Sequence, residues 1–377
     1  MRIAFAIHDA RPGGGQDRYA LELVNRLSAT HDVTLFARSA EGLAPGVDFR
    51  RIITPNRPPF LRAWRFAAGV RQAVGRERWD IVHTIGGAVP GATVITAQYC
   101  QAAWLSAAHR WPSELVGPAE RLYREAVTRL AMRAERQAAS HPSLRAVIGV
   151  SHRTLGEWRS HYGAAPPVEA VAPNGVDPDR MRPGGPAERE RLRVELNVPA
   201  SARLLLLIGA LVRKGVETAL RTLGQLDSNV YLVAVGAGPH AHIRGLAERQ
   251  GVANRLRLVS PVSDIERFYQ GSDIFLFPTR YEPFGMVVAE AWAAGVPVVA
   301  AGTAGALEWA SPDEDALVIE DPTDAEGFAE GVDRLLKDPD LAAQLARRGR
   351  ALAEQLTWDR VVRETEAIYE RVVTRRR

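Results

Sequence analysis

Residues 281–299 read YEPFGMVVAEAWAAGVPVV, which places two glutamates, Glu282 and Glu290, eight positions apart. Pro283 and Gly285 end the apolar run SDIFLFPTR, so Glu282 is predicted to lie on a turn at the carboxyl end of a strand, where open α/β sheets bind ligands. The helix that follows is apolar on all sides, so solvent exposure does not explain a carboxylate at Glu290. A buried acid needs a hydroxyl, an amide or a cation as its partner.

Short β-rich runs alternate with helical stretches along the whole chain, which predicts parallel sheets. In the first half these runs are RIAFAIHD, DVTLFAR, FRRIITP, IVHTIGG, TVITAQY and AVIGVS; in the second half they are RLLLLIGA, VYLVAVGAG, RLRLVS, IFLFPTR, VPVVAAG and ALVIED. A stretch rich in Pro and Gly, residues 163–188, reads as a connection between domains. We therefore expect an α/β protein with two doubly wound domains, residues 1–178 and 179–357.

Composition favours an intracellular enzyme. The 377 residues include one cysteine, Cys100, which excludes a disulfide framework and fits a cytoplasmic protein. The apolar start RIAFAIHDA is too short for a secretory signal. No run approaches the roughly 18 apolar residues of a membrane span.

Positive charge is concentrated in the first half. Residues 1–180 carry 23 basic and 16 acidic side chains, whereas residues 181–377 carry 25 and 28. The most basic segment, Arg57–Asp80, reads RPPFLRAWRFAAGVRQAVGRERWD and places Phe60, Trp64 and several arginines on an amphipathic helix. Such a helix could lie on an anionic membrane surface, or it could cover the sheet with a solvated arginine-rich face. We predict no nucleic-acid partner.

A glycine-rich loop follows the first strand, in ARPGGGQDRYALELVNRL (10–27). Gly14 and Gly15 would let backbone N–H groups approach an anion at the positive end of the next helix. The pattern is not the G-x-G-x-x-G of dinucleotide-binding proteins, and a simple tight turn would use glycine equally well.

Two adjacent cations follow the first strand of the second half, in LLLLIGALVRKGVETAL (204–220). Arg213 and Lys214 stand at the carboxyl end of that strand, just before a helix. A solvated pair is disfavoured there, because cations belong near the other end of a helix. Gly236, in YLVAVGAGP, follows the next strand and is expected to lie at the same ligand-binding edge.

With EPFG in front and AAGVPVV behind, the two glutamates resemble the E-x(7)-E motif of the retaining family-4 glycosyltransferases. These GT-B enzymes include lipopolysaccharide-core glucosyltransferases and mannosyltransferases of lipid-linked glycans. PNGVD, residues 173–177, resembles the family's motif at the domain junction. The resemblance implies two Rossmann-like domains that face a cleft, the first binding the acceptor and the second the donor, and a final helix, 358–377, that packs back on the first.

The resemblance also implies a reaction. A hexose would move from a nucleoside-diphosphate sugar to a hydroxyl of a glycan or lipid-linked acceptor, with retention at the anomeric carbon. A UDP-sugar is the favoured donor, and GDP-mannose is the next. Such an enzyme would serve cell-envelope or polysaccharide biosynthesis, peripherally at the inner face of the membrane. No metal and no cofactor are expected. The alternatives are a GT-B nucleotide-sugar epimerase and a donor-binding protein without catalysis.

The family's functional residues carry over position by position. Glu282 would hold the hydroxyls of the donor sugar and Glu290 those of the ribose, while Arg213 and Lys214 would face the diphosphate. The family's R-x(4)-K is here compressed to that adjacent pair. The remaining expected donor contacts are Gly14, Gly15, Gly236, Phe284, Gly285, Met286 and Val287.

One expected residue is missing. Many family members have a histidine at the end of the strand matched here by TVITAQYC, where this chain has Gln98. We predict that Gln98 forms hydrogen bonds near the donor and belongs to the catalytic set with Glu282, Arg213 and Lys214. His83, His109 and His152 are the alternatives. Asp-x-Asp triplets occur in polar loops and read as caps and turns.

Overall fold

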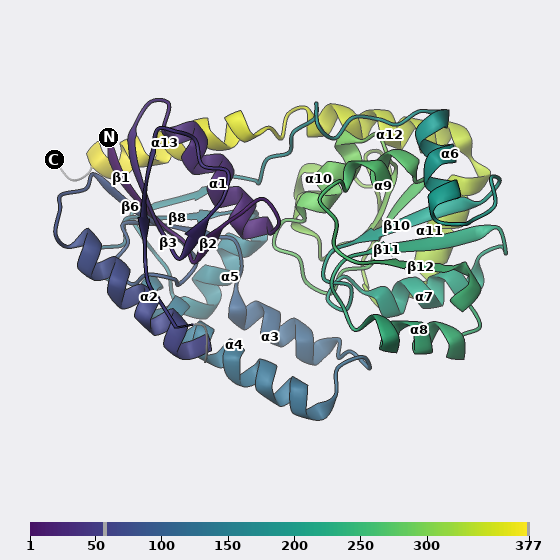
Figure 1. The fold of residues 1–377 in the computed structure, drawn as a ribbon, viewed down its shortest axis with the longest axis horizontal. Helices are drawn as coiled ribbons and strands as arrows, with labels where there is room; N and C mark the ends of the chain where they lie inside the picture. The colour runs from purple at the N-terminus through teal and green to yellow at the C-terminus, as the bar shows by residue number, and fades with distance from the viewer. Residues whose placement is uncertain (56–58, 375–377) are drawn as a thin grey trace. The chain divides into compact units, whose positions relative to one another are not determined.

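The computed structural model describes residues 1–55 and 59–374. The chain divides into two compact units (Figure 1). Unit 1 comprises Met1–Ser106, Pro118–Gly175 and the chain from Trp358 onward; unit 2 comprises Ala107–Gly117 and Val176–Thr357. Each contains a parallel sheet with helices on its faces, so the predicted α/β class with two Rossmann-like doubly wound domains is confirmed.

Unit 1 is built on a seven-stranded sheet in the order β5-β3-β1-β6-β7-β8-β9. Its strands are β1 (Arg2–Ala6), β3 (Asp32–Ala37), β5 (Val47–Arg51), β6 (Ile81–Ile85), β7 (Val94–Ala97), β8 (Ala146–Gly149) and β9 (Val168–Val171). The central strands β7 and β8 are entirely buried, as in β8 with AVIG, because helices cover both faces of a parallel sheet. The strands β2 (Asp9–Ala10) and β4 (Ser39–Ala40) form a separate small pair.

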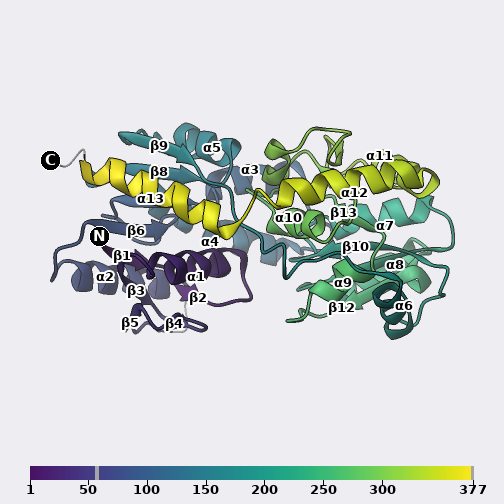
Figure 2. The same cartoon turned by 90° about the horizontal axis from the view of Figure 1, so that it is seen from above.

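The helices of unit 1 connect these strands. They are α1 (Gly15–Leu27), α2 (Pro59–Val74), α4 (Pro118–Ala139), α5 (His152–Tyr162) and α13 (Trp358–Thr374), and α3 (Gln101–Arg110) begins in this unit and ends in unit 2. The last helix, α13, lies along α1 (Figure 2) and contacts both α1 and β9. The end of the chain therefore contributes to the core built by its beginning. Residues 375–377 of the expected final helix lie outside the described part.

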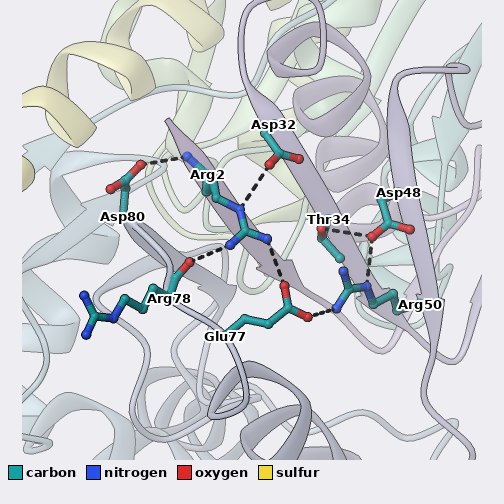
Figure 3. A network of polar contacts seen from close by, with 8 residues as sticks. All are labelled: Arg2, Asp32, Thr34, Asp48, Arg50, Glu77, Arg78 and Asp80. Atoms are coloured by element: carbon teal, nitrogen blue, oxygen red, sulfur yellow. Dashed lines mark hydrogen bonds and ion pairs between the residues drawn. The ribbon is translucent and has the colours of Figure 1, made fainter.

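An ion-pair network joins the amino-terminal ends of β1 and β3 to β5 (Figure 3). Arg2 Nε lies 3.1 Å from Asp32 Oδ2, and Arg2 Nη2 lies 2.8 Å from Glu77 Oε2. Glu77 also pairs with Arg50, whose Nε lies 2.8 Å from Asp48 Oδ2. Because these side chains are largely exposed, the network contributes little to stability. Arg2 and Asp32 lie at the end of the sheet opposite the ligand-binding edge expected for such folds, whereas Asp48 and Arg50 lie further along β5.

Unit 2 is built on a six-stranded sheet in the order β12-β11-β10-β13-β14-β15. The strands are β10 (Arg203–Ile208), β11 (Val230–Val235), β12 (Leu256–Val259), β13 (Ile274–Phe277), β14 (Val298–Ala301) and β15 (Leu317–Ile319). The helices are α6 (Pro186–Glu195), α7 (Val216–Gln225), α8 (His240–Arg249), α9 (Glu266–Gly271), α10 (Met286–Ala293), α11 (Ala325–Lys337) and α12 (Pro339–Ala353). Strand order reverses between β10 and β13, so the loops that follow these two strands flank the topological switch point.

A buried histidine ties α13 to the sheet of unit 1. His83, on β6, is fully buried; its Nδ1 lies 2.5 Å from the Tyr369 hydroxyl and its Nε2 lies 2.8 Å from Thr96 Oγ1. Tyr369 is on α13. Burial lowers the pKa of His83 to about 3. His83, one alternative to Gln98, is thus a neutral residue of the core.

We predict that acidification destabilises unit 1 through His83. An unfolded histidine has a pKa of about 6.5 and binds a proton below it, whereas folded His83 does not bind one until about pH 3. Stability therefore falls as the pH drops through this window, by about 2 kcal/mol between pH 7 and pH 5 for this group. Urea unfolding at the two pH values measures the loss.

Two variants separate His83 from other titrating groups. His83→Gln should be less stable at pH 7 but should lose about 2 kcal/mol less on acidification. His242→Gln, at an exposed position, should keep the wild-type pH dependence. An equal loss in wild type and His83→Gln would show that His83 does not control the acid response.

Candidate functional site

The candidate site of unit 2 is formed by turns at the carboxyl ends of its strands. Gly209 and Gly215 bound the turn after β10 and have φ values of +122° and +78°. A Cβ on Gly215 would lie 1.9 Å from the carbonyl oxygen of Pro278, which follows β13. Only glycine permits both this backbone conformation and this approach. The two turns at the switch point therefore touch through their backbones.

Lys214, Glu282 and Arg213 come together where these turns meet. The Lys214 ammonium pairs with Glu282 Oε2, and Arg213 Nη1 lies 3.9 Å from the same oxygen. Lys214 Nζ also lies 4.9 Å from the centroid of the Phe277 ring. Burial lowers the pKa of Lys214 and the charge of Arg213 lowers it further, while the adjacent carboxylate favours the charged form. Two cations share one carboxylate, so the cluster has a net positive charge that suits an anionic ligand.

The Pro-Phe-Gly turn is fixed from both sides. Phe284 is buried and its ring packs edge-on against Trp309, with 5.6 Å between the centroids. The Gly305 N–H donates to the Glu282 carbonyl at 3.0 Å. Gly285 caps α10 with φ +99°, and Met286 and Val287, both half-buried, form the first turn of that helix. The helix therefore begins four residues after Glu282, and its first N–H groups can bind an anion.

Glu290 is held by a tyrosine that the sequence did not single out. Its side chain is on α10 and only 6% exposed, and Oε2 accepts a hydrogen bond of 2.8 Å from the hydroxyl of Tyr269. Tyr269 is on α9 and fully buried. The buried acid thus has the hydroxyl partner that physical chemistry requires. The available signal was a tyrosine next to Phe268 in ERFYQG, a short helix whose other residues are mostly polar.

Gly236 belongs to the same edge of the sheet. It follows β11 with φ +149°, and a Cβ there would lie 1.9 Å from the Gly209 carbonyl oxygen. His240 Nε2 lies 2.9 Å from the Gly236 carbonyl oxygen. Gly236 therefore adjoins the turn after β10, which carries Arg213 and Lys214.

A buried ion pair beneath this site was missed by the sequence analysis. Arg280, just after β13, pairs with Glu217 in the first turn of α7. The two residues are 6% and 2% exposed. Opposite charges at these two strand-to-helix connections were a possible signal, but nothing in the sequence pairs them.

Gly14 and Gly15 lie in unit 1, at the start of α1. Gly14 is the N-cap with an extended backbone, and a Cβ on Gly15 would meet nothing within 4 Å. The local backbone does not require glycine at Gly15, which leaves open space beside the helix N-terminus. Asp17 lies in the first turn, and burial, followed by the charge of Asp9, raises its pKa to about 6.

Gln98 also lies in unit 1, directly after β7, and its amide is paired. Gln98 Nε2 donates to Asn174 Oδ1 at 2.7 Å, and Asn174 Nδ2 donates to Gln98 Oε1 at 3.1 Å. Both residues are buried. Asn174, from the PNGVD motif, therefore anchors the end of β7. Of the alternatives to Gln98, His109 and His152 are exposed.

The Asp-x-Asp triplets form caps and turns. Asp177 accepts hydrogen bonds of 3.1 Å from the N–H groups of Asp179 and Arg180, and Asp338 caps α12 through the Leu341 N–H at 3.0 Å. Within residues 1–55 and 59–374, no group of three or more His, Cys, Asp or Glu side chains could hold a metal ion.

Comparison with known proteins gives consistent matches for both halves of the chain. Residues 13–180 match the family model described as Glycosyltransferase Family 4, and residues 188–352 match Glycosyl transferases group 1. A D-inositol 3-phosphate glycosyltransferase of Xylanimonas cellulosilytica is 28% identical over 96% of this chain and 93% of its own length. A GDP-mannose-dependent alpha-(1-6)-phosphatidylinositol monomannoside mannosyltransferase of Mycobacterium tuberculosis is 33% identical over 56% of this chain and 58% of its own.

A solved structure shares the fold over almost the whole chain. WaaG, a glycosyltransferase involved in lipopolysaccharide biosynthesis, superimposes with a TM-score of 0.81 over 97% of this chain and 99% of its own, at 23% identity. The two family models cover successive halves of the chain, and the fold is that of the GT-B enzymes. The chain therefore carries a Glycosyltransferase Family 4 match in its first half and a Glycosyl transferases group 1 match in its second half, on a GT-B fold.

Proposed function

We propose that this glycosyltransferase moves a hexose from a nucleoside-diphosphate sugar to a hydroxyl of a glycan or lipid-linked acceptor in cell-envelope or polysaccharide biosynthesis. A UDP-sugar is the first candidate donor and GDP-mannose the second. The observation that carries the proposal is the cluster of Lys214, Arg213 and Glu282 at the switch point of unit 2. Retention at the anomeric carbon rests on the resemblance to family-4 enzymes.

The charges of this cluster suit the departure of a diphosphate. Breaking the anomeric C–O bond leaves negative charge on the leaving group, and fixed cations stabilise that charge more in the transition state than in the ground state. Lys214 and Arg213 supply the cations, and the N-terminus of α10 adds N–H donors. Because this positive charge comes from the chain itself, we propose a reaction that requires no metal.

The two glutamates would divide the rest of the donor between them. Glu282, on the turn before α10, would accept hydrogen bonds from hydroxyls of the sugar. Glu290, oriented by the Tyr269 hydroxyl, would accept them from the ribose. A carboxylate with a fixed orientation loses less conformational entropy on binding than a freely rotating one.

We predict that one nucleotide of a panel raises the melting temperature. The panel contains UDP, GDP, ADP and dTDP with their sugars. A ligand at 100 times its Kd that binds only the folded state adds about 2.7 kcal/mol of stability. Glu290→Ala should abolish the rise, because it removes the ribose contact, whereas Glu248→Ala, at an exposed position on α8, should retain it. If no nucleotide stabilises the wild-type protein, the proposed donor site is wrong.

We also propose that the protein docks on an anionic membrane through α2 and α4 of unit 1. These helices contact each other and lie close together in Figure 1. Trp64 on α2 and Leu122, Tyr123 and Leu130 on α4 are 59%, 68%, 58% and 44% exposed. Arg57 and the side chain of Phe60, from the expected membrane segment, lie outside the described part.

Charge supports the same surface. Arg65 is exposed beside Trp64, and α4 exposes further arginines: Arg121, Arg124, Arg129, Arg133 and Arg136. Apolar side chains with basic neighbours match the interface of an anionic bilayer, which would place the enzyme peripherally at the inner face of the membrane. Among the described residues, no helix has the length and apolarity to cross a bilayer.

We predict that the protein sediments with vesicles containing anionic lipid and not with neutral ones. Replacing Trp64 and Leu122 together by Ser should weaken the partition coefficient at least about tenfold, because each side chain buries apolar surface worth about 1.5–3 kcal/mol. The matched control is Val194→Ser, which changes an apolar residue of unit 2 that is 75% exposed. Equal binding by the double variant and the control would exclude this surface.

A further inference from the structure

We propose that the buried ion pair between Arg280 and Glu217 is a positioning element for the phosphate-facing cations Arg213 and Lys214. This inference rests on the proposed function, because it assigns a role to residues beneath the proposed diphosphate site. It concerns unit 2 alone. The sequence analysis assigned neither residue a role.

The pair joins the two connections at the switch point. Arg280 follows β13, and its Nη2 pairs with Oε2 of Glu217, in the first turn of α7. The side chains are 6% and 3% exposed, so water screens the attraction little. The pair therefore fixes the start of α7 relative to the end of β13.

Backbone contacts bring Arg280 to the other side of the same turn. The Arg280 N–H donates to the Arg213 carbonyl at 3.2 Å, and Thr279 Oγ1 donates to that carbonyl at 3.4 Å. Arg280 thus contacts the chain on both sides of Lys214. Its main chain binds Arg213, which precedes Lys214, and its side chain binds Glu217, which follows it. The direction in which Lys214 points is set between these two attachments.

Glu217 has a second attachment that fixes its own position. Its Oε1 accepts a hydrogen bond of 2.7 Å from the Glu114 N–H, in the segment Ala107–Gly117 of unit 2. One carboxylate oxygen therefore binds Arg280 and the other binds this segment. A carboxylate with both oxygens engaged is a rigid anchor for a guanidinium.

Charge balance indicates that the role of Arg280 is geometric. Its guanidinium is neutralised by Glu217, so the pair adds little to the positive field of the turn, whereas Lys214 and Arg213 share the single Glu282 carboxylate. Loss of the pair should leave these charges in place and change their positions. A small displacement of such a group can reduce the rate about 100-fold.

The test compares ligands that differ by one phosphate. Arg280→Lys keeps the charge and loses the planar fork, and Glu217→Gln keeps the shape and loses the charge. Calorimetry measures the Kd of the nucleoside diphosphate and of the monophosphate with the same base. We expect both variants to bind the diphosphate at least about tenfold more weakly, to change monophosphate binding less than about twofold, and to lower kcat.

A control and a double variant isolate the pair. Arg193→Lys alters another buried ion pair of unit 2, in which Arg193 Nη2 lies 2.7 Å from Asp273 Oδ2 and both side chains are 8% exposed. This variant should lower the melting temperature but change the Kd of the diphosphate and that of the monophosphate by the same factor. The double variant of Arg280→Lys and Glu217→Gln should lose no more diphosphate affinity than the worse single variant, because the two residues act as one unit.

The possible outcomes are distinct. Equal weakening of monophosphate and diphosphate binding, or wild-type affinity for both in Arg280→Lys and Glu217→Gln, would overturn the positioning role. If Arg280→Lys does not fold, the Glu217→Gln measurement decides by the same criterion. A wild-type protein that binds neither ligand would instead refute the proposed function.

Discussion

The site of unit 2 depends on the close approach of backbone turns at glycines, which have no side chain to keep the turns apart. A Cβ on Gly215 or Gly236 would lie 1.9 Å from a carbonyl oxygen of a neighbouring turn. Both residues also have positive φ values, a conformation that side chains disfavour. This constraint lets the turn after β10 pack against those after β11 and β13. The Lys214 ammonium can reach the Glu282 carboxylate only because the turns are this close.

Burial and charge then determine what the site can bind. Taking Lys214 out of water is costly, and the carboxylate of Glu282 offsets part of that cost. Because Arg213 is also present, the cluster has one positive charge in excess. It lies at the end of the sheet where α10 begins, so the N–H groups of that helix are close by. An anion with several oxygens satisfies these groups together, which is the chemistry of a diphosphate.

Unit 1 uses buried polar pairs for a different purpose. His83 joins α13 to the sheet through Tyr369, and Gln98 joins the end of β7 to Asn174. Such pairs are costly when one partner is missing, so they favour a single arrangement of the elements that carry them. The segment after β7 and the returning end of the chain are thereby held in defined positions on the first sheet.

The sequence by itself indicated the fold class, the motif residues Glu282, Glu290, Arg213 and Lys214, and every strand of the two main sheets except β9. That strand lies within residues 163–188, which were predicted to connect the domains. The indicated features follow from local periodicity and from turn residues at short spacing, which the chain records directly. The tertiary structure alone decided which distant side chains meet: Tyr269 with Glu290, Asn174 with Gln98, and Arg280 with Glu217. Their partners are brought together by strand order and helix packing, and hydrophobic periodicity carries no information about which distant polar groups will meet.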